Sequence, residues 1–345
     1  MRKSIIFLQN EIMQYRKPLF NELSKYYDLT VLHAGTRTRT GADFYKEIIL
    51  EKKELGPFCF TSLISILTAI RKCDYVVAMF DLRWPTFLIP MAISRSKYIL
   101  WGHRYSENML ANKIRDILMS KARKIILYGD EELELMSRRG VDISKVSIAW
   151  NTVHVANSKD YSSFEKNSFL FVGRLQPLKR IDDLIKCFAR NYNMLPKNTV
   201  LNIVGDPARE FPAYMDELKQ LSDSLGIRHA VVFHGKNDDE GALARLFSLA
   251  FAYVSPGPVG LGVLHSLAYG VPVITIKTGR HGPEYHNIID RENGLICETI
   301  DCLSESLTEI IENDLYRELG HNAFKQYQSK RQIDNMIDGF CKAIG

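Results

Sequence analysis

Residues 255–275 read Ser255-Pro-Gly-Pro-Val-Gly-Leu-Gly-Val-Leu-His-Ser-Leu-Ala-Tyr-Gly-Val-Pro-Val-Ile-Thr275. This stretch decides the fold, because it predicts a glycine-rich loop, a short helix over 263–269, a glycine stop and a buried strand. Gly257, Gly260 and Gly262 allow the backbone of the loop to come close to a ligand. The helix behind them points its free N–H groups and the positive end of its dipole at the loop, so the loop suits an anion such as phosphate.

A second informative stretch lies upstream and reads Phe169-Leu-Phe-Val-Gly-Arg-Leu-Gln-Pro-Leu-Lys-Arg-Ile-Asp-Asp-Leu-Ile185. Its apolar run predicts a buried parallel strand, and Arg174 follows where that strand ends. Ligands of open α/β sheets bind at the carboxyl ends of the strands. Arg174 and Lys179 could there bind a diphosphate and stabilise the charge that grows on it as it leaves. The alternative is that both are solvated loop residues that pair with Asp182 or Asp183.

Four motifs occur in an order and spacing that match a known family. They are Gly173-Arg174-Leu175 with Lys179, then Val204-Gly205-Asp206, then Phe233-His234-Gly235, then the Pro-Gly-rich loop with Gly270-Val-Pro-Val-Ile-Thr275. The set resembles the C-terminal domain of the family 4 (group 1) glycosyltransferases, which are GT-B enzymes. The resemblance covers residues 165–330 well and the N-terminal half only in general layout. It implies a retaining, metal-independent glycosyltransferase of the hexosyltransferase type, with a nucleotide-sugar as co-substrate and no cofactor.

Alternating strands and helices predict an α/β protein with a doubly wound, Rossmann-like parallel sheet in each half. We expect domains at 1–155 and 156–330, a helix over 331–345 that crosses back to the first domain, and a linker in the polar stretch 151–167. The GT-B resemblance implies a cleft, with the acceptor on the first domain and the donor on the second. The expected strands are 4–9, 29–33, 74–80, 97–101, 124–128, 146–150, 169–172, 200–204, 230–233, 252–254 and 271–276. The expected helices include 18–27, 112–122, 181–191, 213–225, 240–249 and 333–343.

Composition and charge narrow the class of protein. The chain has 345 residues, of which 46% are hydrophobic and 25% charged, as in an average soluble two-domain protein. The first 150 residues carry 24 Lys and Arg against 16 Asp and Glu, and the remainder 21 against 24. A basic first half could rest on an anionic membrane surface or attract an anionic acceptor, unless it is a solvated surface with no partner. Nucleic acid is disfavoured as a partner, because no binding motif or interleaved aromatic residue accompanies the charge.

Other patterns concern location and metals. The six cysteines form no C-x-x-C pair, so we expect reduced thiols in a cytoplasmic protein. No apolar run is long enough to span a membrane, and the first apolar residues are expected to form a core strand instead of a secretory signal. No D-x-D motif is well supported, so no metal site is predicted.

The sequence departs from the family at two positions. In the family, two glutamates bracket the glycine-rich loop, the first touching the donor sugar and the second the ribose, and these positions are Gly257 and His265 here. His265 can still bond a hydroxyl, and Gly257 can offer its N–H to sugar or phosphate; the alternative for His265 is packing against the sheet. Glu284 could supply the missing carboxylate, or it could only cap the helix expected to begin near Tyr285.

The remaining site predictions concern both halves. His103 follows a buried strand, where family members often place a histidine near donor sugar and acceptor, although it could be a loop histidine with no role. Tyr15 and Arg16 lie in the first strand-to-helix turn and are expected on the acceptor side. Gly205 could border the base or simply allow a turn. The residues expected to bind the donor are Gly173, Gly205, Gly257, Val259, Gly260, Leu261, Gly262, His265 and Glu284, and those expected to act in catalysis are Arg174, Lys179 and His103.

By analogy with the family, we expect a cytoplasmic enzyme, peripheral at the inner face of the plasma membrane. Its acceptor would be a saccharide or a polyisoprenyl-linked saccharide in bacterial surface polysaccharide assembly, either lipopolysaccharide or capsule. A nucleotide-sugar epimerase is disfavoured, because the motif set is that of transferases. The main alternative is a catalytically inactive GT-B module that binds a sugar nucleotide or a partner. The absent glutamates support that alternative, and the presence of Arg174 and Lys179 counts against it.

Overall fold

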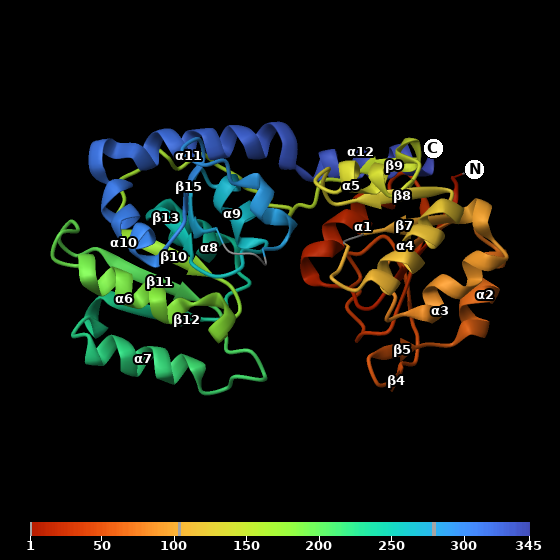
Figure 1. The fold of residues 1–345 in the computed structure, drawn as a ribbon, viewed down its shortest axis with the longest axis horizontal. Coiled ribbons are helices and arrows are strands. Elements are labelled where there is room, and N and C mark those ends of the chain that lie inside the picture. The colour runs from red at the N-terminus through yellow and green to blue at the C-terminus, as the bar shows by residue number, and fades with distance from the viewer. Residues whose placement is uncertain (1, 103–104, 278–280) are drawn as a thin grey trace. The chain divides into compact units, whose positions relative to one another are not determined.

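The computed structural model describes residues 2–102, 105–277 and 281–345. The chain divides into two units, one formed by Met1–His154 with Gln332–Gly345 and the other by Val155–Arg331. Each unit is built around one sheet whose strand pairs are all parallel, with helices packed on it (Figure 1). This architecture is of the GT-B type and confirms the fold class predicted from the alternation of strands and helices.

The sheet of the first unit has the order β3-β2-β1-β6-β7-β8-β9. Winding therefore runs outward from β1 to β3 and then returns to β6 on the other side of β1, which makes the β1/β6 boundary the topological switch point. The central strands are apolar on both faces, as expected for a sheet covered on both sides. The strands are β1 (Ser4–Gln9), β2 (Asp28–His33), β3 (Lys46–Ile49), β6 (Tyr75–Met79), β7 (Tyr98–Trp101), β8 (Lys124–Leu127) and β9 (Val146–Ile148).

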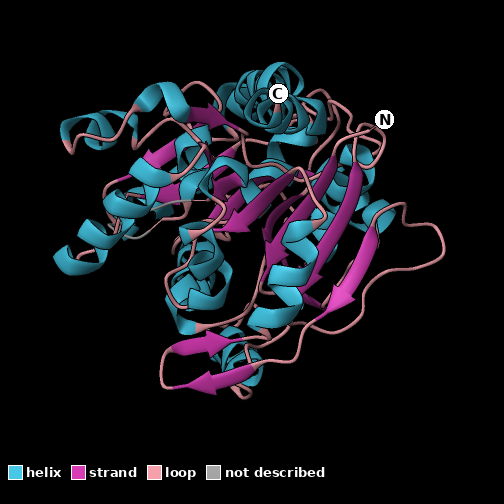
Figure 2. Ribbon diagram, turned by 90° about the vertical axis from the view of Figure 1, so that its right-hand side faces the viewer, coloured by secondary structure: helices cyan, strands magenta, loops and turns pink. Residues whose placement is uncertain are grey.

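Helices and one hairpin complete the first unit. The hairpin, β4 (Lys53–Leu55) with β5 (Phe58–Phe60), is antiparallel and stands apart from the main sheet (Figure 2). The C-terminal helix α12 packs on the same face as α1, and the Phe340 ring meets the Trp101 ring edge-on at 4.9 Å. The helices are α1 (Lys17–Leu23), α2 (Leu63–Arg71), α3 (Pro85–Leu88), α4 (Met109–Lys121), α5 (Leu133–Arg138) and α12 (Ile333–Ile344).

The sheet of the second unit has the order β12-β11-β10-β13-β14-β15. Its switch point lies between β10 and β13, so the loops that follow these two strands, 173–180 and 256–261, meet there. The strands are β10 (Ser168–Val172), β11 (Val200–Val204), β12 (Val231–Gly235), β13 (Ala250–Ser255), β14 (Val273–Ile276) and β15 (Gly294–Cys297). The helices are α6 (Ile181–Asn191), α7 (Tyr214–Ser224), α8 (Glu240–Ser248), α9 (Gly262–Ala268), α10 (Ile300–Glu309) and α11 (Leu315–Gln326).

The stretch predicted as a linker is not one over most of its length. Residues 155–167 belong to the second unit, where Tyr161 donates its N–H to the Tyr269 carbonyl oxygen at 3.1 Å and stacks on the Tyr269 ring at 5.9 Å. The linker prediction was wrong there because two aromatic residues, Tyr161 and Phe164, give this otherwise polar stretch an apolar surface to pack.

Among the described residues there is neither a membrane-spanning helix nor a cluster of metal ligands. No helix within 2–102, 105–277 and 281–345 is both long and apolar enough to cross a membrane. Over the same ranges, no group of three His, Cys, Asp or Glu side chains is arranged to hold a metal ion.

Candidate functional site

The segments that follow β10 and β11 in the second unit run side by side and continue the parallel hydrogen-bond ladder of the two strands. The Gly173 N–H donates to the Val204 carbonyl oxygen at 2.9 Å, and the Leu175 N–H donates to the Asp206 carbonyl oxygen at 2.9 Å. Gly205 has φ +144°, and a Cβ built on it would overlap the carbonyl oxygen of Gly173. The sequence left open whether Gly205 borders the base or simply allows a turn. The geometry of the turn alone already requires glycine there. This close pairing fixes the backbone from which the Arg174 side chain projects.

Arg174 lies exposed at the carboxyl end of β10. Its guanidinium makes no hydrogen bond or ion pair with any residue that the structure describes. Asp183 instead accepts from Arg180 at 2.7 Å, and Asp182 accepts from Lys186 at 2.8 Å. The alternative that Arg174 serves to pair with these two aspartates is therefore not what the structure has, and its donors remain open to a ligand.

Lys179 joins the two loops of the switch point. Its Nζ donates to the Pro258 carbonyl oxygen, and its own carbonyl oxygen accepts the Gly257 N–H at 3.2 Å. A Cβ on Gly257 would overlap the Leu178 carbonyl oxygen and lie 2.7 Å from the Lys179 Cα. Burial lowers the pKa of Lys179, while the charge of Glu284 raises it and that of Arg174 lowers it further. The three charged groups are thus within electrostatic reach of one another.

Backbone donors of the glycine-rich loop divide into two groups. The N–H of Gly257 is used by Lys179, and the N–H of Val259 donates to His281 Nδ1 at 3.2 Å, so neither is the open donor that the sequence suggested for Gly257. The N–H groups of Gly260, Leu261 and Gly262, at the start of α9, bond to none of the described residues. A Cβ on Gly260 would meet nothing within 4 Å. The open donors therefore lie at 260–262.

His281 is a site residue that the sequence interpretation missed. Its Nδ1 accepts the Val259 N–H, and its Nε2 lies 2.8 Å from the Ile276 carbonyl oxygen, an arrangement that suits a neutral ring protonated on Nε2. The ring stacks on Tyr285 with centroids 4.1 Å apart. Burial lowers the pKa of His281, partly offset by its bond to Ile276. The neutral histidine holds the glycine-rich loop against the segment that follows β14; its only sequence signal was its place between a buried strand and a Gly-Pro turn.

The pH dependence of stability follows from this histidine and two others. Burial lowers the pKa of His281, His265 and His234 below the usual 6.5. The unfolded chain therefore takes up protons near pH 6.5 that the folded chain does not. The stability that the three neutral histidines contribute is therefore complete above that pH and is lost as the pH falls. We expect the temperature of the unfolding midpoint to decrease as the pH is lowered from about 6.5 to about 5. The fall should be shallower in His281→Asn, whose amide can both donate and accept; an unchanged slope would contradict this role of His281.

Glu284 lies in the short 3-10 helix Pro283–Asn287, and its side chain is nearly buried. A Cβ on Gly282 would lie 2.5 Å from Glu284 Oε2, so the carboxylate folds back over that glycine. The expected helix near Tyr285 is thus only a single 3-10 turn. Because the charge of Glu284 raises the pKa of Lys179, the carboxylate belongs electrostatically to the loop region of the switch point.

His265 lies on α9 with its side chain 21% exposed, and its Nε2 is 3.9 Å from Oε2 of Glu240 at the start of α8. Its ring is parallel to the Phe247 ring at 6.4 Å, and burial lowers its pKa. The Tyr269 hydroxyl donates to the other oxygen of Glu240. A neighbouring helix therefore brings a carboxylate to His265, at the position where the family has glutamate. Sequence reasoning missed Glu240, whose only signal was its place at the start of a helix behind a strand end.

The first-unit predictions divide into described and undescribed residues. His103 lies outside the described residues. Tyr15 is 36% exposed and Arg16 only 8%, in the turn between β1 and α1. Both lie at the carboxyl edge of the sheet, beside the switch point of the first unit.

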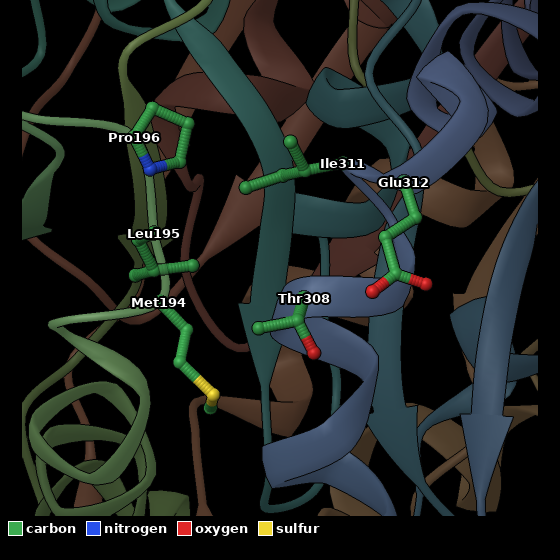
Figure 3. Close-up of a pocket in the computed structure, with 6 residues that line it drawn as sticks. All are labelled: Met194, Leu195, Pro196, Thr308, Ile311 and Glu312. Carbon is green, nitrogen blue, oxygen red and sulfur yellow. The ribbon is translucent and has the colours of Figure 1, made fainter.

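A small cavity of about 210 Å³ lies elsewhere in the second unit (Figure 3). It lies between the connection from α6 to β11 and the end of α10, at the amino-terminal edge of the sheet. Its lining has one charged side chain, that of Glu312, and no convergent set of polar groups. It therefore lies at the opposite edge from Arg174 and lacks the features of the functional site. The residues that line it are Met194, Leu195, Pro196, Thr308, Ile311 and Glu312.

Two doubly wound parallel sheets define a protein of the GT-B class, and at one switch point lie a cation and N–H groups that no described residue pairs. Residues 157–326 match the family described as "Glycosyl transferases group 1". Residues 157–326 therefore belong to this family, as the motifs they contain predicted.

Two curated relatives align with about half of the chain. The N-acetyl-alpha-D-glucosaminyl L-malate synthase of Bacillus anthracis is 26% identical over 183 residues, which are 51% of this chain and 45% of that protein. The D-inositol 3-phosphate glycosyltransferase of Nocardioides sp. is 29% identical over 162 residues, which are 43% of this chain and 35% of that protein. The chain thus spans less than half the length of these relatives.

Solved structures share the fold over almost the whole chain. Anabaena Alr3699/HepE in complex with UDP has a TM-score of 0.77 at 17% identity, with 99% of both chains covered. The same protein in complex with UDP-glucose also has a TM-score of 0.77 at 17% identity, again with 99% of both chains covered. The lipopolysaccharide outer core galactosyltransferase WaaB has a TM-score of 0.68 at 15% identity, with 99% of both chains covered.

Proposed function

We propose that the protein is a retaining glycosyltransferase that moves a sugar from a nucleotide-sugar to an acceptor hydroxyl, with the donor bound by the second unit. The observation that carries the proposal is the unpaired guanidinium of Arg174 at the β10/β13 switch point, beside Lys179 and the open N–H groups of residues 260–262. The group 1 family match over residues 157–326 supports the same assignment. The retaining outcome rests on family resemblance.

The chemistry assigned to these groups is stabilisation of the leaving diphosphate. The bond from the anomeric carbon to the phosphate oxygen breaks, and negative charge grows on that oxygen. Arg174 can donate two parallel N–H bonds to phosphate oxygens, and the N–H groups of residues 260–262 can donate to the same anion. A bound diphosphate favours the charged form of Lys179 and so opposes the lowering of the Lys179 pKa by burial.

Three side chains of the second unit are assigned to donor hydroxyls. We place the paired His265 and Glu240 at the ribose, since together they offer an imidazole and a carboxylate where the family offers a glutamate. We place Glu284 at the transferred sugar, since its carboxylate lies in the region of Lys179 and the glycine-rich loop. A carboxylate accepts hydroxyl hydrogens and so distinguishes a sugar from a bare phosphate.

We propose UDP as the nucleotide, because the fold relative HepE has been solved with UDP and with UDP-glucose. A thermal-shift screen of UDP, GDP, dTDP and CMP should then show a rise in the unfolding midpoint with UDP. At a concentration one hundred times Kd, the added stability is about 2.7 kcal/mol. No rise with any of the four would contradict the assigned donor site.

The inactive-module alternative keeps one specific observation, the absence of the two family glutamates at Gly257 and His265. A module of that kind binds the donor but does not turn it over. Release of UDP from UDP-glucose, followed in a coupled assay with and without candidate acceptors, separates the two functions. Binding without any release of UDP would favour the module.

For the acceptor, we propose a saccharide or polyisoprenyl-linked saccharide of bacterial surface polysaccharide assembly, met at the inner face of the membrane. The galactosyltransferase WaaB, named for the lipopolysaccharide outer core, shares the fold. Support also comes from α4, whose outer face exposes Met109, Leu110, Ile114 and Ile117. Leu110, Ile114 and Ile117 follow helical spacing, so they lie on one face. The exposed Lys113 and Lys121 on the same helix complement an anionic lipid surface.

Vesicle binding tests this surface. Wild-type protein should sediment with vesicles that contain anionic lipid, and the double substitution Ile114→Glu and Ile117→Glu should weaken binding at least about tenfold, since each change removes apolar contact and adds repulsion. Leu225→Glu, an exposed apolar position of the second unit, is the matched control and should bind as the wild type does. Equal sedimentation of all three proteins would rule out α4 as the contact.

A further inference from the structure

Arg16 has an unusual environment for an arginine. Its side chain is 8% exposed, and its guanidinium carbon lies 4.9 Å from the ring centre of Trp101, 5.0 Å from that of Tyr15 and 5.2 Å from that of Tyr128. Its only hydrogen bond within the described part of the chain is from Nη1 to the Met336 sulfur at 3.7 Å, and a thioether is a weak acceptor. No carboxylate among the described residues pairs with it.

A buried, unpaired cation lowers the stability of the fold unless an anion or another group compensates its charge. A guanidinium keeps its charge when buried, and an unpaired buried charge destabilises a fold much more than a paired one. Cation–π contact with three rings offsets part of this cost but uses none of the N–H donors, which lie in the plane of the group. Four of the five N–H donors of Arg16 therefore have no acceptor in the described structure.

A second donor without a partner lies under Arg16. The indole N–H of Trp101, whose ring the guanidinium covers, is buried and has no hydrogen-bond partner among the residues that the structure describes. Trp101 ends β7, and Tyr128 follows β8, so the cluster lies at the carboxyl edge of the sheet, where α/β proteins bind ligands. At this edge, the N–H donors of Arg16 and Trp101 therefore lie together with almost no acceptor among the described residues.

We propose that Arg16, with Trp101, forms a binding site for an oxyanion, a phosphate or carboxylate group, carried by the acceptor. The site would hold the charged group of the acceptor in the first unit and so select acceptors that carry one. Tyr15, stacked against the guanidinium and partly exposed, forms the accessible wall of the site. The inference rests on the proposed transferase function for the identity of the ligand, but the site itself is defined by the first unit alone.

The test uses inorganic phosphate and malonate as probes, at constant ionic strength, in an Arg174→Ala background that removes the assigned donor site. At about ten times Kd, either probe should raise the unfolding midpoint by about 2–4 °C. The rise should disappear when Arg16→Met is added and should persist with Arg71→Met, an exposed arginine of the same unit. The probe with the larger effect distinguishes a phosphate from a carboxylate ligand.

A purely structural role for Arg16 predicts a different result. If the guanidinium served only to pack between the rings, Arg16→Met would lower the midpoint without any probe. We expect it to be unchanged or higher, because an unpaired buried charge is removed. Should Arg16→Met fail to fold, Arg16→Lys keeps the charge but loses the planar fork, and its phosphate shift should be smaller than that of Arg16.

Two outcomes would overturn the proposal: no shift with either probe, or an equal shift with and without Arg16. The donor assignment is tested separately by the shift with UDP-glucose in protein that retains Arg174. That shift should survive Arg16→Met. If UDP-glucose gives no shift in the wild type, the transferase proposal fails and the anion site is unaffected. If only phosphate and malonate give no shift, the anion site fails and the transferase proposal is unaffected.

Discussion

Arg174→Ala should reduce kcat/KM for sugar transfer by about 100-fold or more, with little change in stability. Each charge-assisted hydrogen bond to phosphate contributes about 1.5–3 kcal/mol, and a guanidinium can make two to the leaving diphosphate. Because Arg174 bonds to no other described residue, its removal leaves no internal partner unsatisfied. Steady-state release of UDP from the donor, measured beside thermal unfolding, checks both halves of the expectation.

The matched control for this change is Arg190→Ala. Arg190 is an exposed arginine on α6 of the same unit and pairs with Asp301 at 2.7 Å on the surface. Surface ion pairs contribute little, so this variant should keep wild-type kcat/KM. A similar loss in both variants would point to a general effect of charge on the unit. Wild-type activity in Arg174→Ala would remove the central element of the proposed site.

Gly205→Ala should destabilise the second unit by about 3 kcal/mol or more. The added Cβ would overlap the Gly173 carbonyl oxygen, and φ of +144° is a conformation that residues with a side chain rarely adopt. The β10 and β11 turns must then move apart, which also displaces Arg174. We expect the unfolding midpoint to fall by about 6–12 °C and donor binding to weaken in the remaining folded protein.

Gly260→Ala is the control for Gly205→Ala. A Cβ at Gly260 meets nothing within 4 Å, and its φ is not in the left-handed region, so stability should change by no more than about 0.5 kcal/mol. Any effect of Gly260→Ala should be confined to donor binding. If both variants unfold at the same temperature, the close contact between the two turns is not what requires glycine at 205.

Much of the fold could be predicted because buried parallel strands and amphipathic helices leave strong local patterns. The strand over 200–204 and the helix over 181–191 have the predicted bounds. Edge elements were missed for a physical reason: β3 is largely exposed and carries charged residues, so its pattern is not that of a buried strand. The same holds for the β4–β5 hairpin, whose strands are mostly exposed.

The parts of the candidate site that belong to sequence motifs could be predicted. Contacts between side chains of separate helices and loops could not. Gly257 and Lys179 belong to separate motifs, and the family order of those motifs placed them in one site. The pairing of His265 with Glu240 depends on how α8 and α9 pack, and no local signal records it. The role of His281 likewise depends on a backbone N–H from another loop, as does the use of the Gly257 N–H by Lys179.

The position of α12 has a consequence for biosynthesis. Residues Gln332–Gly345 belong to the first unit, whose core includes Met336 and Phe340, although the whole of Val155–Arg331 precedes them in the chain. A ribosome therefore delivers the complete second unit before the last piece of the first. Until α12 is synthesised, the first unit has an apolar face of its sheet uncovered while the second unit folds. A nascent chain that stalls before residue 332 would carry a finished second unit and an unfinished first one, and such a chain is a natural substrate for chaperones.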